Sequence, residues 1–234
     1  MRLRKKLYQV SGAVYGFLGS AYIVQYSNGY ILIDSSRMEG LNTIRKNLTY
    51  WRIPETQITH VLLTHGHDDH SGCAGYFQQQ GAKVYLGKQD VEMVERGDLG
   101  EESPFTNHIM PRFTPDVAID TDIKIKIGNL TVFAYMVPGH TNGSVIYALN
   151  LDNEQLLFTG DTFFADGETG SQAYTGWKGD LNFDSQKLRQ SFAKIWALKL
   201  NPDIILGGHG IPRIGNDAKN VIQVAYKYFL VNNR

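Results

Sequence analysis

The sequence has few cysteines, no excess of basic residues and no long apolar stretch, and each of these features excludes a class of protein. Cys73 is the only cysteine among 234 residues, which excludes an intrachain disulfide and a metal site built from several cysteines. Lys and Arg total 23 and Asp and Glu total 23, so the chain lacks the basic excess that nucleic-acid binding favours. No apolar stretch approaches the roughly 20 residues that span a bilayer. We therefore expect a cytoplasmic protein whose partners include neither nucleic acid nor a membrane.

What is present is the composition of a globular protein, with 42% hydrophobic and 20% charged residues. The chain has no linker, repeat or low-complexity segment, so we predict a single domain over residues 1–234. Basic residues 2–6 precede a mildly apolar run, as in a signal peptide. Polar residues interrupt that run, and it continues into strand-like segments 21–26 and 30–33 around Asn28-Gly29, a strong hairpin signal. We therefore interpret the N-terminus as part of the folded protein.

Hydrophobic periodicity predicts that strands and helices alternate along most of the chain. Helical spacing of apolar residues indicates helices at 38–50, 72–80, 90–96, 188–196 and 221–229. Short apolar or alternating runs indicate strands at 61–63, 83–86, 123–127, 130–137, 144–149, 156–158 and 204–206. Two β-rich halves, each closed by helices, predict two sheets packed face to face with the helices outside.

Residues 97–119 have no clear period, and a loop of that length in a compact domain is usually functional. Its apolar and aromatic residues suit a lid over a binding site. Anchoring of the loop to the core is the alternative, because aromatic side chains commonly serve that purpose. The candidate lid residues are Phe105, His108, Met110 and Phe113.

Histidine and aspartate gather where apolar strands end. The segment from Thr64 to His70 reads Thr-His-Gly-His-Asp-Asp-His and follows the predicted strand 61–63. Three later predicted strands likewise end just before a candidate, namely His140, Asp161 and His209. We expect all four strand ends at one rim of the sheets, where ligand sites form. The candidate metal ligands are His65, His67, Asp69, His70, His140, Asp161 and His209.

Imidazole nitrogen and carboxylate oxygen are donors that zinc, iron and manganese accept, and the set contains no thiolate. His65 and His67 are two residues apart on an extended segment, so both can face one metal ion. Asp69 and His70, at the turn that follows, can face a neighbouring ion. A shared carboxylate such as Asp161 can bridge two ions about 3.5–4 Å apart. By contrast, we interpret His60 and His108 as core or surface residues, and Asp68 as a solvated turn residue.

The series His65-x-His67-x-Asp69-His70, then His140, Asp161 and His209, resembles the metallo-β-lactamase superfamily, from about Tyr22 to Gly210. The resemblance implies an α+β fold, a four-layer αβ/βα sandwich of two mixed sheets with helices outside. It also implies that one metal is bound by His65, His67 and His140, and the other by Asp69, His70 and His209, with Asp161 bridging. Asp34 matches an acidic residue that supports the site of the family.

The implied cofactors are two divalent metal ions, Zn²⁺ first, with iron or manganese as alternatives. A hydroxide held between them would attack an acyl carbon, so the implied activity is hydrolysis of a small-molecule substrate. Asp69 is the implied catalytic residue, because it would orient the hydroxide and pass its proton to the leaving group.

Aspartate at 161 and histidine at 70 resemble the glyoxalase II, lactonase and phosphodiesterase branches, since lactamase members often have a thiolate ligand. Segments 176–181 and 202–209 are most similar to glyoxalase II-like thioesterases, so we expect a thioester or lactone substrate. Two departures from glyoxalase II count against glutathione as part of the substrate. Trp177 stands where that family often has arginine. Only 25 residues follow His209, whereas glyoxalase II proper resembles this chain but carries a larger C-terminal helical region that holds glutathione. The substrate candidates, in the loop after Asp161, are Tyr174, Trp177 and Lys178.

Four alternatives remain open at the level of the sequence. A mononuclear iron persulfide dioxygenase keeps the whole motif but uses His65, His140 and Asp161 as its ligands. A β-lactamase and a nuclease or other phosphodiesterase are less favoured, and a non-catalytic binding protein has no reason to keep seven ligands. Outside the motif, we interpret Cys73 as a small core residue and Asp180 as a residue that is structural or supports the site without binding metal, rather than a catalytic one. The oligomeric state is open.

Overall fold

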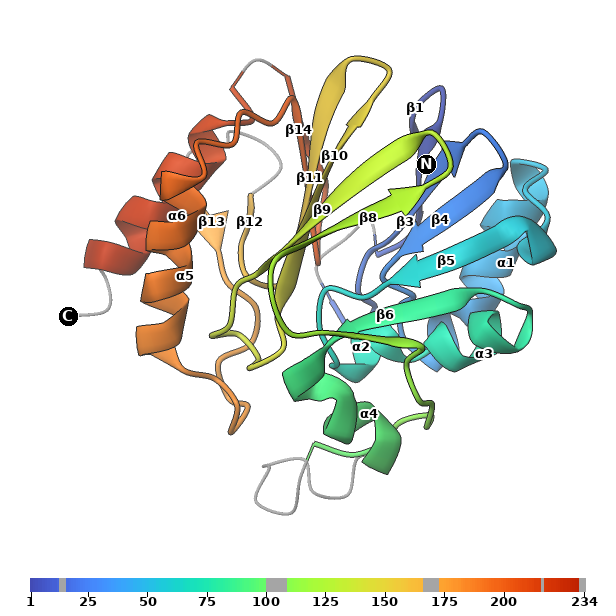
Figure 1. Cartoon of the computed structure of the whole chain (residues 1–234), viewed down its shortest axis with the longest axis horizontal. Helices are drawn as coiled ribbons and strands as arrows, with labels where there is room; N and C mark the ends of the chain where they lie inside the picture. Colours follow the sequence, from blue (N-terminus) through green and yellow to red (C-terminus); the bar gives the residue numbers. More distant parts are fainter. Residues whose placement is uncertain (13–15, 100–108, 166–172, 216, 232–234) are drawn as a thin grey trace.

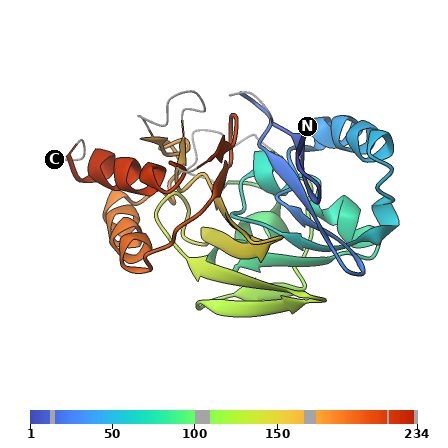
Figure 2. The same ribbon diagram turned by 90° about the horizontal axis from the view of Figure 1, so that it is seen from above.

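Two β-sheets pack face to face, and helices cover the outer face of each sheet (Figure 1). The computed structural model describes residues 1–12, 16–99, 109–165, 173–215 and 217–231. Viewed from above, the helices α1 and α3 lie outside one sheet and α5 and α6 lie outside the other (Figure 2). This arrangement confirms the predicted four-layer αβ/βα sandwich.

The first sheet has seven strands in chain order, antiparallel from β1 to β4 and parallel from β4 to β7. The predicted hairpin forms, but Tyr26 pairs with Gly29, so its loop residues are Ser27 and Asn28 rather than Asn28 and Gly29. The strands are β1 (Arg2–Arg4), β2 (Leu7–Ser11), β3 (Ala21–Tyr26), β4 (Gly29–Ile33), β5 (Ile58–Leu62), β6 (Lys83–Gly87) and β7 (Val117–Ile119).

The second sheet has six strands in the order β15-β14-β11-β10-β9-β8, and only its β11–β14 pair is parallel. A separate two-stranded sheet joins β12 (Phe164–Ala165) to β13 (Ala173–Tyr174). The strands of the second sheet are β8 (Ile123–Ile127), β9 (Leu130–Met136), β10 (Val145–Leu151), β11 (Glu154–Gly160), β14 (Ile204–Gly207) and β15 (Arg213–Ile214).

The helices bury the apolar faces that the sequence predicts. Ile44, Leu48 and Phe77 pack against the first sheet, whereas Phe192 and Phe229 pack against the second. The α-helices are α1 (Leu41–Tyr50), α2 (Asp68–Ser71), α3 (Ala74–Gln79), α4 (Val91–Arg96), α5 (Ser185–Ala197) and α6 (Asn220–Val231), and the 3₁₀ turns are Met38–Gly40, Glu55–Gln57 and Lys88–Asp90. The short helix predicted at 72–80 is confirmed as α3, and a further short helix that was not predicted, α2, begins inside the histidine motif.

A closely packed apolar layer holds the two sheets together. Tyr147 and Phe158 are completely buried in it, and the Phe158 ring meets Tyr22 edge-on at a centroid distance of 5.7 Å. Burial of each such side chain stabilises the fold by about 1.5–3 kcal/mol. Because this layer sets the position of one sheet against the other, it also sets where the ends of β5, β9, β11 and β14 meet.

The segment 97–119 is only partly a loop, because its last residues form β7. Met110 and Phe113 are buried in the apolar cluster beneath α3 and α4, so the prediction that they form a lid is wrong and the anchoring alternative is correct for them. Apolar side chains so close to an existing core gain more from packing into it than from facing solvent. Phe105 and His108 lie outside the described residues.

In the part of the chain that the structure describes, no helix has the length and apolar character needed to span a bilayer. The cytoplasmic location and the single domain over 1–234 stay predictions.

Candidate metal centre

The seven predicted ligands meet where strands of the two sheets end. His65 and His67 follow β5, and the first turn of α2 carries Asp69 and His70. The other three follow strands of the second sheet: His140 after β9, Asp161 after β11 and His209 after β14. The structure groups them as His65 with His67 and His140, as His65 with His70 and Asp161, and as Asp69 with His70 and His209.

Three buried imidazoles form a nearly equilateral triangle of nitrogen atoms. The His65 Nε2–His67 Nδ1 and His140 Nε2–His67 Nδ1 distances are both 3.1 Å, and His140 Nε2 lies 3.2 Å from His65 Nε2. Ligands of a tetrahedral zinc ion at about 2.0 Å lie about 3.3 Å apart, so this triangle fits one face of such a tetrahedron. Burial and the neighbouring imidazoles lower the pKa of His65 well below its usual value, and burial lowers the pKa of His140 to about 3.

A second group of donors lies beside the triangle. His209 Nε2 lies 3.3 Å from Asp69 Oδ2, and His70 Nε2 lies 3.5 Å from the same oxygen. Burial favours the neutral form of Asp69, but the charge of His70 outweighs it and lowers the pKa of Asp69 to about 2. Burial likewise lowers the pKa of His209, yet the charge of Asp161 overrides it and raises this pKa to about 10.

Asp161 lies between the two groups. Its Oδ1 is 3.4 Å from His70 Nε2, and its Oδ2 is 3.4 Å from His209 Nε2 and 3.7 Å from His140 Nε2. His70 Nε2 and Asp161 Oδ1 are buried without a hydrogen bond, although buried polar atoms are normally satisfied. A cation between them would satisfy both, so the donor set fits bound metal. The strand end carrying His209 approaches closely only because residue 208 is glycine: a Cβ there would lie 2.0 Å from Asp161 Oδ1.

Two further carboxylates orient the imidazoles. Asp34 accepts a hydrogen bond from His70 Nδ1 at 2.9 Å, which leaves the Nε2 lone pair of His70 facing the centre. Asp180 contacts His67 Nε2 in the same way, which leaves the lone pair of His67 Nδ1 facing the other two nitrogens of the triangle. Asp34 also accepts hydrogen bonds from the backbone and hydroxyl of Thr64. The supporting positions predicted for Asp34 and Asp180 are both confirmed.

Asp90 has a comparable position that sequence reasoning missed. Its Oδ2 accepts hydrogen bonds from Gly66 N at 2.9 Å and Thr141 Oγ1 at 2.7 Å, and its Oδ1 accepts one from Gly143 N at 2.7 Å. This buried carboxylate therefore joins the loop of His65 and His67 to the loop of His140. A signal was available, because Asp90 is also an acidic residue just past an apolar strand, β6.

Replacing Asp90 with asparagine is expected to destabilise the protein by about 1.5–3 kcal/mol, because one acceptor oxygen becomes an NH₂ group that faces N–H and O–H donors. Loosening of the two histidine loops should also weaken metal binding about 10- to 100-fold. Urea unfolding and competition with a chromogenic chelator measure the two effects. Asp120→Asn is the matched control, since Asp120 is exposed and lies 3.7 Å from Lys88. Wild-type metal affinity in Asp90→Asn would contradict a positioning role.

Three residues were interpreted as lying outside the metal site. Asp68 is not a solvated turn residue: it is buried, and its Oδ2 lies 2.6 Å from Arg37 Nε, because the start of α2 faces the loop after β4. Cys73 is completely buried, which raises the pKa of its thiol to about 12 and confirms its core position. His60 is half-buried on β5, where its Nδ1 lies 2.7 Å from Thr59 Oγ1, and it belongs to none of the ligand groups.

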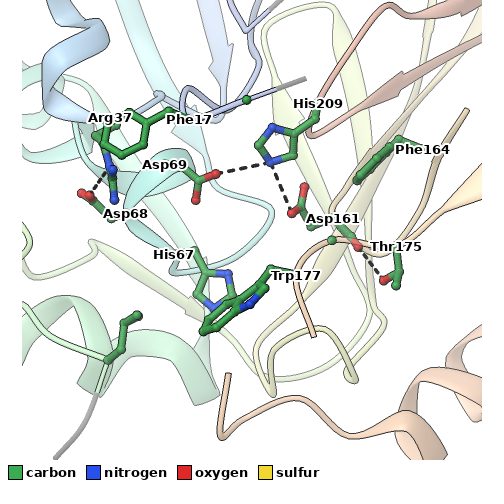
Figure 3. Close-up of a pocket in the computed structure, with 13 residues that line it drawn as sticks. Phe17, Arg37, His67, Asp68, Asp69, Asp161, Phe164, Thr175, Trp177 and His209 are labelled. Carbon is green, nitrogen blue, oxygen red and sulfur yellow. Dashed lines mark hydrogen bonds and ion pairs between the residues drawn. The ribbon is translucent and has the colours of Figure 1, made fainter. Parts of the chain in front are cut away.

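A cavity of about 620 Å³ opens above the centre (Figure 3). Of the three substrate candidates only Trp177 lines it, with its ring 6.3 Å from the His67 ring. Tyr174 pairs with Phe164 in the small sheet, and Lys178 turns outward so that its Nζ lies 5.7 Å from the Phe229 ring. The described lining residues are Gly16, Phe17, Arg37, His67, Asp68, Asp69, Leu99, Asp161, Phe164, Thr175, Gly176, Trp177 and His209.

The two packed sheets and the imidazole and carboxylate donors at their strand ends together define a class of αβ/βα sandwich proteins with a candidate metal site. The family model of the metallo-beta-lactamase superfamily matches residues 14–209, and the chain belongs to that superfamily. The resemblance stated from the motif is therefore confirmed.

The relatives differ in how much of their length the chain spans. The "Probable polyketide biosynthesis zinc-dependent hydrolase PksB" of Bacillus subtilis is 25% identical over 171 residues, which are 71% of this chain and 65% of that protein. A hydroxyacylglutathione hydrolase of Pseudomonas syringae is 30% identical over 114 residues, 49% of this chain and 37% of that protein. "Uncharacterized protein Rv2581c" of Mycobacterium tuberculosis is 32% identical over 191 residues, 77% and 80% of the two chains. The chain thus spans under two thirds of the first two relatives.

Solved structures share the fold at low identity. A metallo-beta-lactamase of Cronobacter sakazakii superposes with a TM-score of 0.78 at 19% identity, covering 100% of this chain and 93% of that one. The subclass B3 enzyme BJP-1 of Bradyrhizobium japonicum gives a TM-score of 0.72 at 19% identity, covering 95% and 92%. These likenesses establish the architecture.

Proposed function

We propose that this protein is a metal-dependent hydrolase that cleaves an acyl bond of the thioester or lactone type. The observation that carries the proposal is the pair of adjoining donor groups, buried on one side and open on the other to a cavity of about 620 Å³. The names of relatives support the proposal, since the Bacillus protein is named a "Probable polyketide biosynthesis zinc-dependent hydrolase" and the Pseudomonas protein a "Hydroxyacylglutathione hydrolase".

The donor groups suit two divalent cations, with zinc the first choice because the donors are imidazoles and carboxylates. One would be held by the triangle of His65, His67 and His140, and the other by Asp69, His70 and His209. Asp161, within 3.4–3.7 Å of nitrogens from both groups, is placed to bridge them. Such cations would supply a water whose pKa lies near neutrality, and hence a hydroxide nucleophile at pH 7.

The side chains of the centre would orient the attacking water and transfer its proton. Asp69 lines the cavity and is ionised at neutral pH, because its pKa is lowered to about 2, so it can accept a hydrogen bond from the attacking water and orient it. As the water oxygen adds to the acyl carbon, Asp69 can take up the proton that this water loses; the bond from carbon to sulfur or ring oxygen then breaks, and the leaving group takes the same proton from Asp69. Asp34 and Asp180 keep His70 and His67 in the required tautomer throughout.

Elemental analysis of the purified protein, alongside a chromogenic panel of a thioester, a lactone, a β-lactam and a phosphodiester, tests the proposal. We expect about two divalent metal ions per chain and hydrolysis of the thioester or the lactone. One iron per chain, with oxygen uptake when glutathione persulfide is added, would instead identify a persulfide dioxygenase. Bound metal without turnover of any substrate in the panel would favour a binding protein.

A further inference from the structure

Besides the metal-ligand candidates, the Arg37–Asp68 ion pair and Thr175, the described walls of the cavity above the centre are apolar side chains and glycine. The cavity is lined from four separate segments of the chain by Phe17, Leu99, Phe164 and Trp177. Figure 3 shows Phe17, Phe164 and Trp177 around it. Phe17 is 64% exposed and Trp177 is 42% exposed, so two large rings face solvent at the mouth of the cavity. Exposed apolar rings at the rim of a cavity are typical of a binding site, and about 620 Å³ suits a small molecule.

The only lysine or arginine among the described lining residues is Arg37, and its charge is already balanced. Its Nε lies 2.6 Å from Asp68 Oδ2, and its guanidinium carbon lies 3.8 Å from the centre of the Phe17 ring. Both members of the ion pair are mostly buried, with 13% and 7% of their side chains exposed. The pair therefore presents little net positive charge to a ligand, and Figure 3 shows it beside Phe17, apart from Trp177. Away from the metal-ligand candidates, an anionic substrate tail would thus lose its hydration without gaining from the described walls an opposite charge that is not already paired, which is costly.

We propose that the cavity binds an uncharged, apolar acyl group, and that Trp177 is the specificity-determining contact because it stands beside His67 at the mouth of the centre. This inference rests on the proposed hydrolase function and names its substrate class: thioesters or lactones of medium-length apolar acids rather than acyl groups that carry a carboxylate. Since each buried methylene strengthens binding, kcat/KM should rise about fourfold per methylene until the cavity is filled.

The test uses the metal-loaded protein with acetyl, butanoyl and hexanoyl thioesters of N-acetylcysteamine, together with the adipoyl thioester, which matches hexanoyl in length and adds a carboxylate. We expect kcat/KM to increase with chain length and to be at least about tenfold lower for adipoyl than for hexanoyl. Trp177→Ala should lower the hexanoyl-to-acetyl ratio of kcat/KM about tenfold. Trp196→Ala, which removes a 48% exposed tryptophan on α5, is the matched control and should keep the ratio.

Calorimetric binding of the corresponding amides, with nitrogen in place of the thioester sulfur, separates this inference from the hydrolase proposal. Tighter binding of the hexanoyl amide than of the acetyl and adipoyl amides, weakened by Trp177→Ala, would support the inference even if no thioester were hydrolysed. Hydrolysis without chain-length preference, with the amides bound equally, would overturn the inference and leave the hydrolase proposal standing. Preference for adipoyl would also overturn it, since the cavity would then recognise negative charge.

Discussion

Replacing Asp161 with alanine is expected to lower kcat/KM by at least about 10³-fold, which corresponds to about 4 kcal/mol of lost transition-state stabilisation. The reason is its position between the two donor groups, 3.4 Å from His70 Nε2 and from His209 Nε2. Without that carboxylate the nitrogens on both sides lose the negative charge between them, so bound metal should fall as well. Steady-state kinetics with the substrate found in the panel and elemental analysis of the same sample measure both losses.

The control for this substitution is His60→Ala, which removes a histidine of the first sheet that belongs to none of the ligand groups. It should keep the metal content of the wild type. Full turnover in Asp161→Ala would eliminate the dinuclear mechanism, whereas a halved metal content in His60→Ala would show that the ligand set is wrong.

The second large effect is expected for Asp34→Ala. This substitution leaves His70 Nδ1 and the backbone and hydroxyl donors of Thr64 buried without their common acceptor. The free energy of unfolding should fall by about 3 kcal/mol. Because the His70 ring is no longer oriented, metal affinity should fall about 10- to 100-fold. Urea unfolding and chelator competition measure the two quantities.

Asp203→Ala is the matched control, because Asp203 also accepts a backbone hydrogen bond, from Gln155 N at 2.8 Å, but far from the centre. It should cost stability without changing metal affinity. If Asp34→Ala and Asp203→Ala changed stability alike and both left metal affinity unchanged, Asp34 would be a structural residue only.

The prediction of the fold succeeded where the pattern is local. Alternation at Ile123, Ile125 and Ile127 predicted β8, and helical spacing from Leu188 to Trp196 predicted α5. Boundaries failed where capping and tertiary packing decide them: α5 begins at Ser185 because the Asp184 side chain accepts hydrogen bonds from the backbone of Gln186 and Lys187. The strands β1 and β2, which pair with each other, were not predicted individually; β2 is buried along its whole length, so it does not show the alternation of a half-exposed strand.

The sequence by itself determined the ligand candidates and their order. A strand end followed by glycine and histidine is a local feature, so the seven ligand candidates, the supporting Asp34 and the superfamily were all readable without coordinates. The absence of other cysteines likewise determined that the centre contains no thiolate cluster.

Only the tertiary structure decided which other residues surround those donors. The buried carboxylate of Asp90, the pairing of Asp68 with Arg37 and the selection of Trp177 over Tyr174 and Lys178 all depend on segments distant in sequence. The physical reason is that periodicity reports which side of a strand or helix is apolar, whereas hydrogen bonds and cavity walls depend on how separate elements approach one another. The candidate metal ligands thus lie in local sequence motifs, whereas the cavity above them forms through the packing of separate elements.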